Sequence, residues 1–442
     1  MQGVANRLGV VFFPAFDWAI SPTHPERQER LLYTMDQLKE EGVFDIPGIE
    51  EYRPDEAGLD DIRRVHFSFP DSQTNLTPSH IISAGGAIKA ARLFMEGELD
   101  KSFALVRPPG HHAMKVVHGG RGFCAVNMEA IMVEYMRRHY GVGRVAIVDT
   151  DCHHGDGTQD IYWHDPDTLY ISIHQDGRTL FPGSGFPGEM GGPKAQGKNI
   201  NIPLPPGTSD EGFLHAVDEV VLPVLQDFQP EVIINSAGQD NHFSDPLTNM
   251  NFSAQGYAEL NQKLDPDIAV LEGGYSIQGA LPYVNLGIVL AMAGLDYSYV
   301  REPDFDPEAL RHDNSTQDYI QKVCQNARQN YFQPPGTGVS REKEGGFFVR
   351  SKEIFYDTSF INERQKEHLL DCDHCPGLLL IETSGGKNKN CLGIEVPRNA
   401  CSQCQSMGRD YFAKAKENAG LTNLQFIDRP RDRSERFLAS KE

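Results

Sequence analysis

The sequence lacks any uninterrupted apolar run of membrane-spanning length, and no basic and then apolar signal segment follows Met1. We therefore expect a cytoplasmic protein with no membrane partner. Basic residues are also scarce relative to acidic ones, which gives a formal net charge of −21. This charge argues against non-specific nucleic-acid binding and mildly favours cationic substrates, although a role of the acidity in solubility alone explains it equally well.

Hydrophobic residues make up 39% and charged residues 23% of the 442 positions, as expected for a globular protein. This length exceeds one typical domain, so we expect a large α/β domain and a smaller second one. The 8 cysteines are unevenly spread, and most lie near the C-terminal end: Cys372, Cys375, Cys391, Cys401 and Cys404. Without a secretory signal, paired Cys-x-x-Cys motifs favour metal binding over disulfides.

Short apolar runs of strand type recur before residue 300, at 9–13, 103–106, 145–148, 169–173, 232–235 and 268–271. Helical patterns lie between several of them, at 81–95, 127–140 and 210–228. Strands that alternate with helices predict a doubly wound parallel sheet, in which sites form beyond the carboxyl ends of the strands. Polar motifs follow several of these runs, which indicates one composite site.

The domain boundary is expected after a closing helix at 314–332, capped by Asn314 or Ser315. The sequence thus predicts a large domain over residues 1–332, a Pro/Gly-rich linker over 333–346, and a Cys-rich module over 347–442. The tail at 429–442 is mostly charged and is expected to be poorly ordered.

The most informative motif is residues 149–157, which directly follow a buried apolar run. Asp149, Asp151 and His153 alternate, so in extended backbone their side chains point the same way. A carboxylate and an imidazole that converge at a strand end suit a divalent ion such as zinc; an ordinary polar strand end is the alternative. Asp240, after the run 232–235, could supply a third ligand and leave positions open for water and substrate, as in catalytic zinc sites.

A Pro- and Gly-shaped loop at 107–113 carries the tandem histidines His111 and His112. Each could be oriented by its own carboxylate, the arrangement that general acid–base catalysis needs; histidines that merely bond loop carbonyls are the alternative. In Glu272-Gly273-Gly274-Tyr275, the glycines let the chain turn so that the Tyr275 hydroxyl can face the metal and stabilise an oxyanion.

Two aromatic residues in glycine-bordered loops, Phe123 after Gly122 and Phe181, could line a narrow apolar slot for an aliphatic chain. Packing in the core is the alternative explanation for each ring.

Residues from about 9 to 300 resemble the zinc-dependent histone deacetylase family, with its acetylpolyamine amidohydrolase and acetoin-utilisation relatives. The matching segments, in the order and spacing of the family, are 24–31, 107–113, 122–124, 149–157, 236–240, 245–247 and 271–275. The resemblance implies an arginase-like doubly wound α/β fold for the catalytic domain. It also implies a zinc-dependent amidohydrolase that removes an acetyl or short acyl group from an acylated amine such as acetyl-lysine.

The resemblance also implies a role for each matching residue. The zinc ligands would be Asp151, His153 and Asp240. His111 would pair with Asp149 as an electrostatic partner, and His112 would pair with Asp156 and act as general base and acid. The resemblance further implies that Tyr275 polarises the carbonyl, that substrate contacts come from Gly122, Phe123, Phe181, Leu247 and Gly273, and that K⁺ could bind near Asp149, Asp151, His153 and Ser172.

Some positions depart from the family, since Met128 follows Asn127 and Gln239 precedes the third ligand. Leu247 stands where polyamine-selective relatives carry an acidic residue, which disfavours an acetylpolyamine without excluding it or a small metabolite. A non-catalytic acyl-lysine binding protein and a two-manganese ureohydrolase are further alternatives. The full set of ligands, histidines and tyrosine favours the single-zinc enzyme, and the physiological substrate and oligomeric state stay open.

The spacing of two Cys-x-x-Cys pairs predicts a second, structural zinc site formed by Cys372, Cys375, Cys401 and Cys404, with a reduced metal-free fold as the alternative. The resemblance does not cover this module. Because every candidate catalytic residue precedes the linker, a chain that ends near residue 335 is expected to fold and to act on small acetylated substrates.

Overall fold

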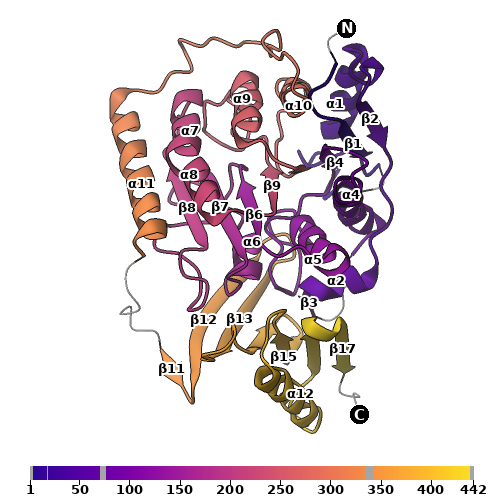
Figure 1. The fold of residues 1–442 in the computed structure, drawn as a ribbon, viewed down its shortest axis with the longest axis vertical. Coiled ribbons are helices and arrows are strands. Elements are labelled where there is room, and N and C mark those ends of the chain that lie inside the picture. Colours follow the sequence, from indigo (N-terminus) through magenta and orange to yellow (C-terminus); the bar gives the residue numbers. More distant parts are fainter. Residues whose placement is uncertain (1–2, 17, 70–75, 335–341, 439–442) are drawn as a thin grey trace.

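The computed structural model describes residues 3–16, 18–69, 76–334 and 342–438. Residues 335–341 of the predicted linker and 439–442 of the predicted tail lie outside this described part. Figure 1 shows a helix-covered sheet that contains β1 (Leu8–Phe13) and, below it, a second sheet that contains β17 (Arg433–Leu438), the last strand of the chain that the structure describes. No described helix is long and apolar enough to cross a membrane.

The larger sheet has 8 parallel strands in the order β2-β1-β4-β10-β9-β6-β7-β8, which confirms the predicted doubly wound α/β class. Its strands are β1 (Leu8–Phe13), β2 (Ile49–Tyr52), β4 (Lys101–Val106), β6 (Val145–Asp149), β7 (Thr168–Gln175), β8 (Asn199–Leu204), β9 (Val232–Ala237) and β10 (Ile268–Leu271). The central strands β6 and β10 are almost entirely apolar, as expected where helices cover both faces of a sheet, whereas β4 and β9 also contain buried polar residues such as Ser102 and Asn235.

Successive residues of a strand enter opposite cores, as the pleat requires. Along β6, Ala146 and Val148 join the core under α1, α7, α8, α9, α10 and α11, whereas Val145 and Ile147 join the core under α2, α4, α5 and α6. These helices are α1 (Glu29–Glu40), α2 (Leu59–Val65), α4 (Pro78–Met95), α5 (Met128–Tyr140), α6 (Asp156–Tyr162), α7 (Asp210–Ala216), α8 (Leu222–Phe228), α9 (Ala254–Leu264), α10 (Leu281–Met292) and α11 (Asn314–Phe332). A π-helical segment, Val217–Val221, joins α7 to α8.

Two local predictions were wrong. The helix at 314–332 forms as expected, but its cap is Asp313, whose Oδ1 accepts a hydrogen bond of 2.8 Å from the Thr316 N–H. The residue just outside the helix is extended and so can turn its side chain back onto the first turn. The tail is also ordered through Leu438, because the strand β17 (Arg433–Leu438) pairs with β16 (Asn423–Asp428).

Residues 343–438, which we call the C-terminal module, form a 7-stranded sheet in the order β11 to β17, with α12 (Ser402–Lys416) packed on it. Its other strands are β11 (Lys343–Glu344), β12 (Phe347–Tyr356), β13 (Ile361–Leu370), β14 (Leu379–Gly385) and β15 (Asn388–Val396). Only the pair β15–β16 is parallel. The strand β11 lies within the span assigned to the linker, so part of that span belongs to the sheet.

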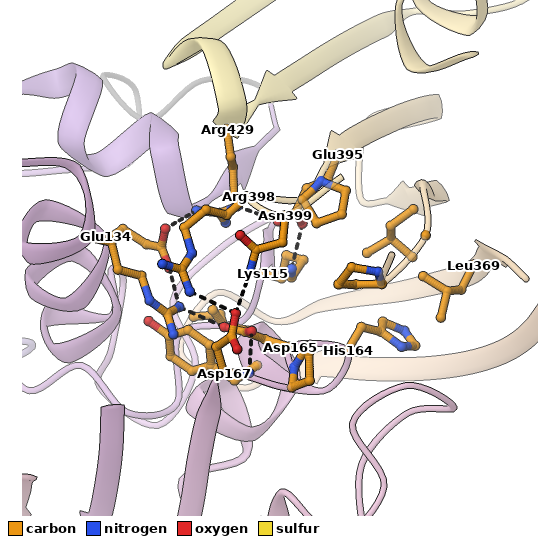
Figure 2. Close-up of a pocket in the computed structure, with 18 residues that line it drawn as sticks. Lys115, Glu134, His164, Asp165, Asp167, Leu369, Glu395, Arg398, Asn399 and Arg429 are labelled. Carbon is orange, nitrogen blue, oxygen red and sulfur yellow. Dashed lines mark hydrogen bonds and ion pairs between the residues drawn. The ribbon is translucent and has the colours of Figure 1, made fainter. Parts of the chain in front are cut away.

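The module shares a hydrophobic core with the larger part of the chain. Phe67, Phe69 and Val116 pack in one buried cluster with Leu369, Leu379, Ile381, Cys391 and Ile427 of the module. Beside this cluster, Figure 2 shows charged side chains that join the two parts. Glu395 contacts Lys115 at 2.6 Å, and Arg429 contacts Glu134 at 2.5 Å.

This shared core generates a stability prediction. Phe67 is fully buried, and an added Cβ at Gly393 of β15 would lie 3.1 Å from its ring. Phe67→Ala should lower the free energy of unfolding by about 3–5 kcal/mol, because it removes buried area and leaves a cavity. Urea unfolding measures this change, with Tyr299→Ala, at a side chain 56% exposed, as the control. A loss below about 1 kcal/mol would contradict the shared core.

Candidate active site

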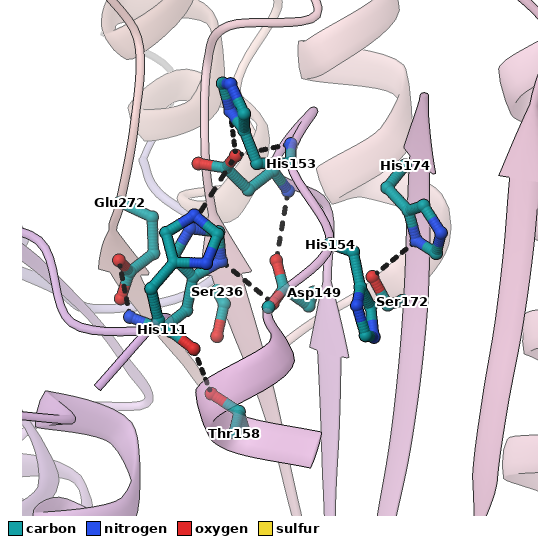
Figure 3. Close-up of polar contacts among 12 residues, drawn as sticks. His111, Asp149, His153, His154, Thr158, Ser172, His174, Ser236 and Glu272 are labelled. Atoms are coloured by element: carbon teal, nitrogen blue, oxygen red, sulfur yellow. Dashed lines mark hydrogen bonds and ion pairs between the residues drawn. The ribbon is translucent and has the colours of Figure 1, made fainter. Parts of the chain in front are cut away.

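The site forms where four neighbouring strands of the larger sheet end. In the order β4-β10-β9-β6, these strands are adjacent, and each is followed by one of the polar motifs identified from the sequence. The carboxyl ends of parallel strands lie at the same edge, so residues far apart in the chain meet there. Figure 3 shows His111, Asp149, His153, Ser236 and Glu272 gathered at this edge.

Asp151, His153 and Asp240 bring one ligand atom each within 4.8 Å of one another. His153 Nδ1 lies 2.8 Å from Asp240 Oδ2 and 3.2 Å from Asp151 Oδ1. Both carboxylates are fully buried, whereas His153 is partly exposed. Two carboxylates and one imidazole match the donor set of a three-ligand catalytic zinc site, so these residues fit a divalent cation.

Main-chain N–H groups hold the two carboxylates in place. The Gly273 N–H donates to Asp151 Oδ2 at 2.7 Å, and the Cys152 N–H donates to Asp240 Oδ1 at 2.8 Å. A Cβ at Gly273 would lie 2.5 Å from Asp240 Oδ2, so only glycine lets the backbone approach this closely. Burial and then the nearby Asp151 raise the pKa of Asp240, a cost that a bound cation would offset.

The tandem histidines are paired as expected from the family resemblance. His111 Nδ1 lies 3.2 Å from Asp149 Oδ2, and His112 Nδ1 lies 2.8 Å from Asp156 Oδ1. The rings of His112 and His153 are 6.1 Å apart between centroids. Each imidazole is therefore oriented by a carboxylate beside the cluster of ligands.

The electrostatic surroundings of the two histidines differ. Burial acts to lower the pKa of His111, but Asp151 and Asp149 outweigh it and raise the pKa to about 10. Burial, followed by the positive charge of His111, lowers the pKa of His112 well below its usual value. The carboxylates thus favour the protonated form of His111, whereas the surroundings of His112 favour its neutral form, which is the form that can accept a proton.

Aromatic rings surround these groups. The ring centroids of Phe181 and His112 are 5.1 Å apart, and those of Phe123 and Tyr275 are 5.9 Å apart. Phe181 remains 37% exposed. The Tyr275 N–H donates to Asp245 Oδ2 at 2.7 Å, and Leu247, which is 37% exposed, donates its N–H to Asp245 Oδ1 at 2.9 Å. Asp245 thus fixes the backbone of both residues.

The sequence motif that contains Tyr275 also holds a residue whose role sequence reasoning missed. Glu272 Oε2 accepts hydrogen bonds from the main-chain N–H groups of Gly110 (2.7 Å) and His111 (3.1 Å), so it positions the histidine loop (Figure 3). Burial raises the pKa of Glu272 and also that of its neighbour Glu129, the latter to about 7. The sequence does contain a signal for this role, since Glu272 directly follows the fully apolar strand β10. A carboxylate at such a place is buried and must find hydrogen-bond donors inside the protein.

Two of the residues that the resemblance links to K⁺, Asp149 and Ser172, lie side by side. Asp149 and Ser172 are neighbours across the strands β6 and β7, and the Asp149 carboxylate accepts hydrogen bonds from the Tyr170 hydroxyl (2.7 Å) and the Asp151 N–H (3.1 Å). Ser172 Oγ lies 2.8 Å from His174 Nδ1. His154, next to the ligands, is bonded instead to Ser184 (2.9 Å) and is thereby accounted for without a metal.

A second candidate metal centre lies in the C-terminal module. The sulfur atoms of Cys372, Cys375, Cys401 and Cys404 all lie within 4.8 Å of one another. Cys372 Sγ is 3.8 Å from Cys401 Sγ, and Cys375 Sγ is 3.4 Å from Cys404 Sγ. Four Zn–S bonds of about 2.3 Å in a tetrahedron give sulfur separations of about 3.8 Å, so the residues fit a closed structural site.

The comparisons with known proteins agree with this geometry. Residues 72–286 match the histone deacetylase domain. A probable deacetylase of Archaeoglobus fulgidus is 46% identical over 318 residues, which cover 66% of this chain and 87% of the relative. The chain belongs to the histone deacetylase family.

Other members of the family extend the comparison. A histone deacetylase-like amidohydrolase of Pseudomonas aeruginosa is 35% identical over 245 residues, 53% of this chain and 63% of that relative. The crystal structure of the HDA15 HD domain has a TM-score of 0.63 at 26% identity and covers 73% of this chain and 94% of its own. The protein is therefore a histone deacetylase-family hydrolase of the deacetylase or amidohydrolase type.

The two candidate metal centres can be tested separately in this deacetylase-family protein. Asp151→Ala should remove one metal ion per chain, the one at the Asp151–His153–Asp240 cluster. The double variant Cys401→Ser/Cys404→Ser should also remove one ion per chain, the one at the four cysteines, because each change removes ligands from one cluster only. Elemental analysis of the purified proteins measures both losses. Cys324→Ser, at a buried cysteine of α11, should keep the full content. Unchanged content in the double variant would contradict the Cys₄ site.

Proposed function

We propose that the protein is a zinc-dependent deacetylase that removes acetyl, or another short acyl group, from lysine side chains of peptides. The observation that carries the proposal is the meeting of three groups at one site: the ligands Asp151, His153 and Asp240, the His112–Asp156 pair, and Tyr275. A binding protein without turnover needs no oriented proton acceptor. The aromatic rings of Phe123 and Phe181 beside these groups suit the aliphatic stem of a lysine.

The chemistry that zinc supplies when bound to this trio is the polarisation of the acyl carbonyl and the acidification of a water molecule. His112 Nε2 takes the proton from the attacking water, while Asp156 holds Nδ1 and so fixes the tautomer. His112 then returns this proton to the nitrogen of the departing amine, so that acetate and a free amine are released. The Tyr275 hydroxyl donates a hydrogen bond to the carbonyl oxygen as negative charge develops there.

Further parts of the sequence prediction belong to this proposal. Residues 1–332 would form the catalytic domain, 333–346 a linker and 347–442 a metal-binding module, and K⁺ would bind near Asp149 and Ser172. The cytoplasmic location and the lack of a nucleic-acid partner stay predictions. An acetylated polyamine is the second candidate substrate, and Leu247 argues against it because an apolar side chain offers a polyamine cation no partner.

A substrate panel tests the proposal. The purified protein, loaded with zinc, is incubated with an acetyl-lysine peptide, longer acyl-lysine peptides and an acetylated polyamine, and kcat/KM is measured for each. We expect the acetyl-lysine peptide to be the best substrate.

Tyr275→Phe, which removes one hydroxyl, should lower kcat roughly a hundredfold with little change in KM, because an oxyanion donor acts only in the transition state.

Three results would contradict parts or all of this proposal. A higher kcat/KM for the polyamine would replace the peptide as the substrate class. A Tyr275→Phe variant with normal kcat would remove this hydroxyl from the mechanism. No turnover of any member by zinc-loaded protein would favour the binding-protein alternative.

The division of labour between the histidines gives a separate prediction. His112→Ala should lower kcat by about 10²–10⁴-fold, since the variant loses the group that moves the proton. His111→Ala should cost less, because His111 contributes charge and orientation from its contact with Asp149. Both variants are compared in kcat at equal zinc content. A larger loss for His111→Ala would reverse the two roles.

A further inference from the structure

The hairpin of β12 and β13 reaches from the C-terminal module to the loop beside His112. In the turn between these strands, Asp357 Oδ1 accepts a hydrogen bond of 2.9 Å from the Gly122 N–H, and Ser359 Oγ accepts one of 2.9 Å from the Gly120 N–H. A Cβ at Gly119 would lie 2.6 Å from Ser359 Cβ. The module therefore directly contacts residues 119–122, which we call the glycine loop. The family match at 72–286 contains this loop but not the hairpin.

Arg121, between these glycines, connects the hairpin to Asp156. Its Nε and Nη2 donate to Asp156 Oδ2 at 2.9 and 2.6 Å, and its Nη1 donates to the carbonyl oxygen of Phe355 in β12. Asp156 uses its other oxygen, Oδ1, for His112. Because Arg121 is 9% exposed, water cannot easily replace a lost protein partner, so the hairpin carbonyl helps to fix this ion pair.

Gly122 also lies against the ring of His112. A Cβ at this position would lie 2.3 Å from His112 Cδ2, and the backbone has φ of 51° at Gly122 and 67° at Phe123. This left-handed region favours glycine and is costly for phenylalanine, so the loop needs contacts that hold it. The hydrogen bond from Gly122 to Asp357 is one of them.

The helix that carries Asp156 rests on the same two strands. Lys352 of β12 forms ion pairs with Asp160 of α6 and with Glu367 of β13, the latter at 2.7 Å. Asp160 and Glu367 are both buried. Thus the two elements that orient His112, the glycine loop and α6, are both held by the β12–β13 hairpin.

We propose that Asp357 is a positioning residue for the hydrolysis: through Gly122, and next to the Arg121–Asp156 pair, it holds His112 in place. The C-terminal module then supports turnover of every substrate, small ones included. This inference rests on the proposed role of His112. It opposes the expectation that a chain ending near residue 335 keeps its activity on small substrates.

The test uses the full-length protein and a small acetyl-lysine amide as the substrate. Asp357→Ala should lower kcat roughly ten- to a hundredfold with KM nearly unchanged, because His112 is displaced while the binding rings remain. Asp357→Asn keeps an oxygen that can accept from Gly122, so it should restore most of kcat. Glu353→Ala is the matched control, since this acidic side chain of β12 is 79% exposed and its ion-pair partner Arg364 is 84% exposed.

The melting temperature and the zinc content accompany each measurement. If Asp357→Ala does not fold, Ser359→Ala, which removes only the Gly120 contact, should still lower kcat in the same direction by a smaller factor. Normal kcat in folded Asp357→Ala, or a loss in Asp357→Asn as large as in Asp357→Ala, would overturn the proposal. Inactivity of the wild-type protein on all acetylated amines would instead overturn the proposed function.

Discussion

The placement of buried negative charge is the constraint on which the rest of this structure depends. Asp149, Asp151, Asp240 and Glu272 are all fully buried at one edge of the larger sheet. Ionised carboxylates are costly in such surroundings unless donors and cations surround them. The structure supplies main-chain N–H groups to each of them, and the crowding of the ligand pair leaves a place that a divalent cation suits.

This requirement explains local features that otherwise look unrelated. Gly273 must be a glycine because its backbone approaches both ligand carboxylates, at 2.5 and 2.6 Å from the place of a Cβ. Arg30, also fully buried, donates to the carbonyl oxygens of Glu272 and Gly274 at 2.6 Å each. These hydrogen bonds fix the turn that leads to Tyr275, and the Arg30 guanidinium lies 5.0 Å from the Tyr275 ring centroid. The backbone at 272–274 is thus held on one side by Arg30, through its carbonyl oxygens, and on the other by Asp151, through the Gly273 N–H.

The sequence predicts the centre of the sheet well because those strands are apolar on both faces, as in Val145–Asp149 and Ile268–Leu271. The strands β2 and β8 at the two edges of the sheet were not predicted from the sequence. Ile49–Tyr52 contains two exposed glutamates, and Asn199–Leu204 alternates asparagine with apolar residues. The ligands Asp151 and His153, two residues apart directly after the strand β6, could be predicted from their spacing. Arg121 could not, and for Glu272 the sequence shows a carboxylate at the end of an apolar strand but not its partners, because contacts across many residues of sequence bring both to the site.

The strand β13 shows why the C-terminal module was the hardest part to predict. In Ile361–Leu370, the buried positions include Glu363, Gln365 and Glu367, so the polar pattern suggests exposure where the strand is in fact covered. Tertiary partners make this burial acceptable, since Lys352 pairs with Glu367 and the Tyr356 hydroxyl bonds Glu363 at 2.6 Å. No local rule of hydrophobic periodicity can anticipate such partners.

Buried polar contacts also make the position of the module specific. Two apolar surfaces can slide over each other at small cost, whereas a displaced ion pair leaves a buried charge without its partner. The contacts of Lys115 with Glu395 and of Arg429 with Glu134 join the two parts in this way, and the shared cluster around Phe67 adds apolar burial. The β12–β13 hairpin is built on the same interface, and its contacts with Gly120, Arg121 and Gly122 bring it to the loop beside His112. The larger part of the chain and the module therefore share one hydrophobic core and one set of buried ion pairs, although the sequence predicts a linker between them.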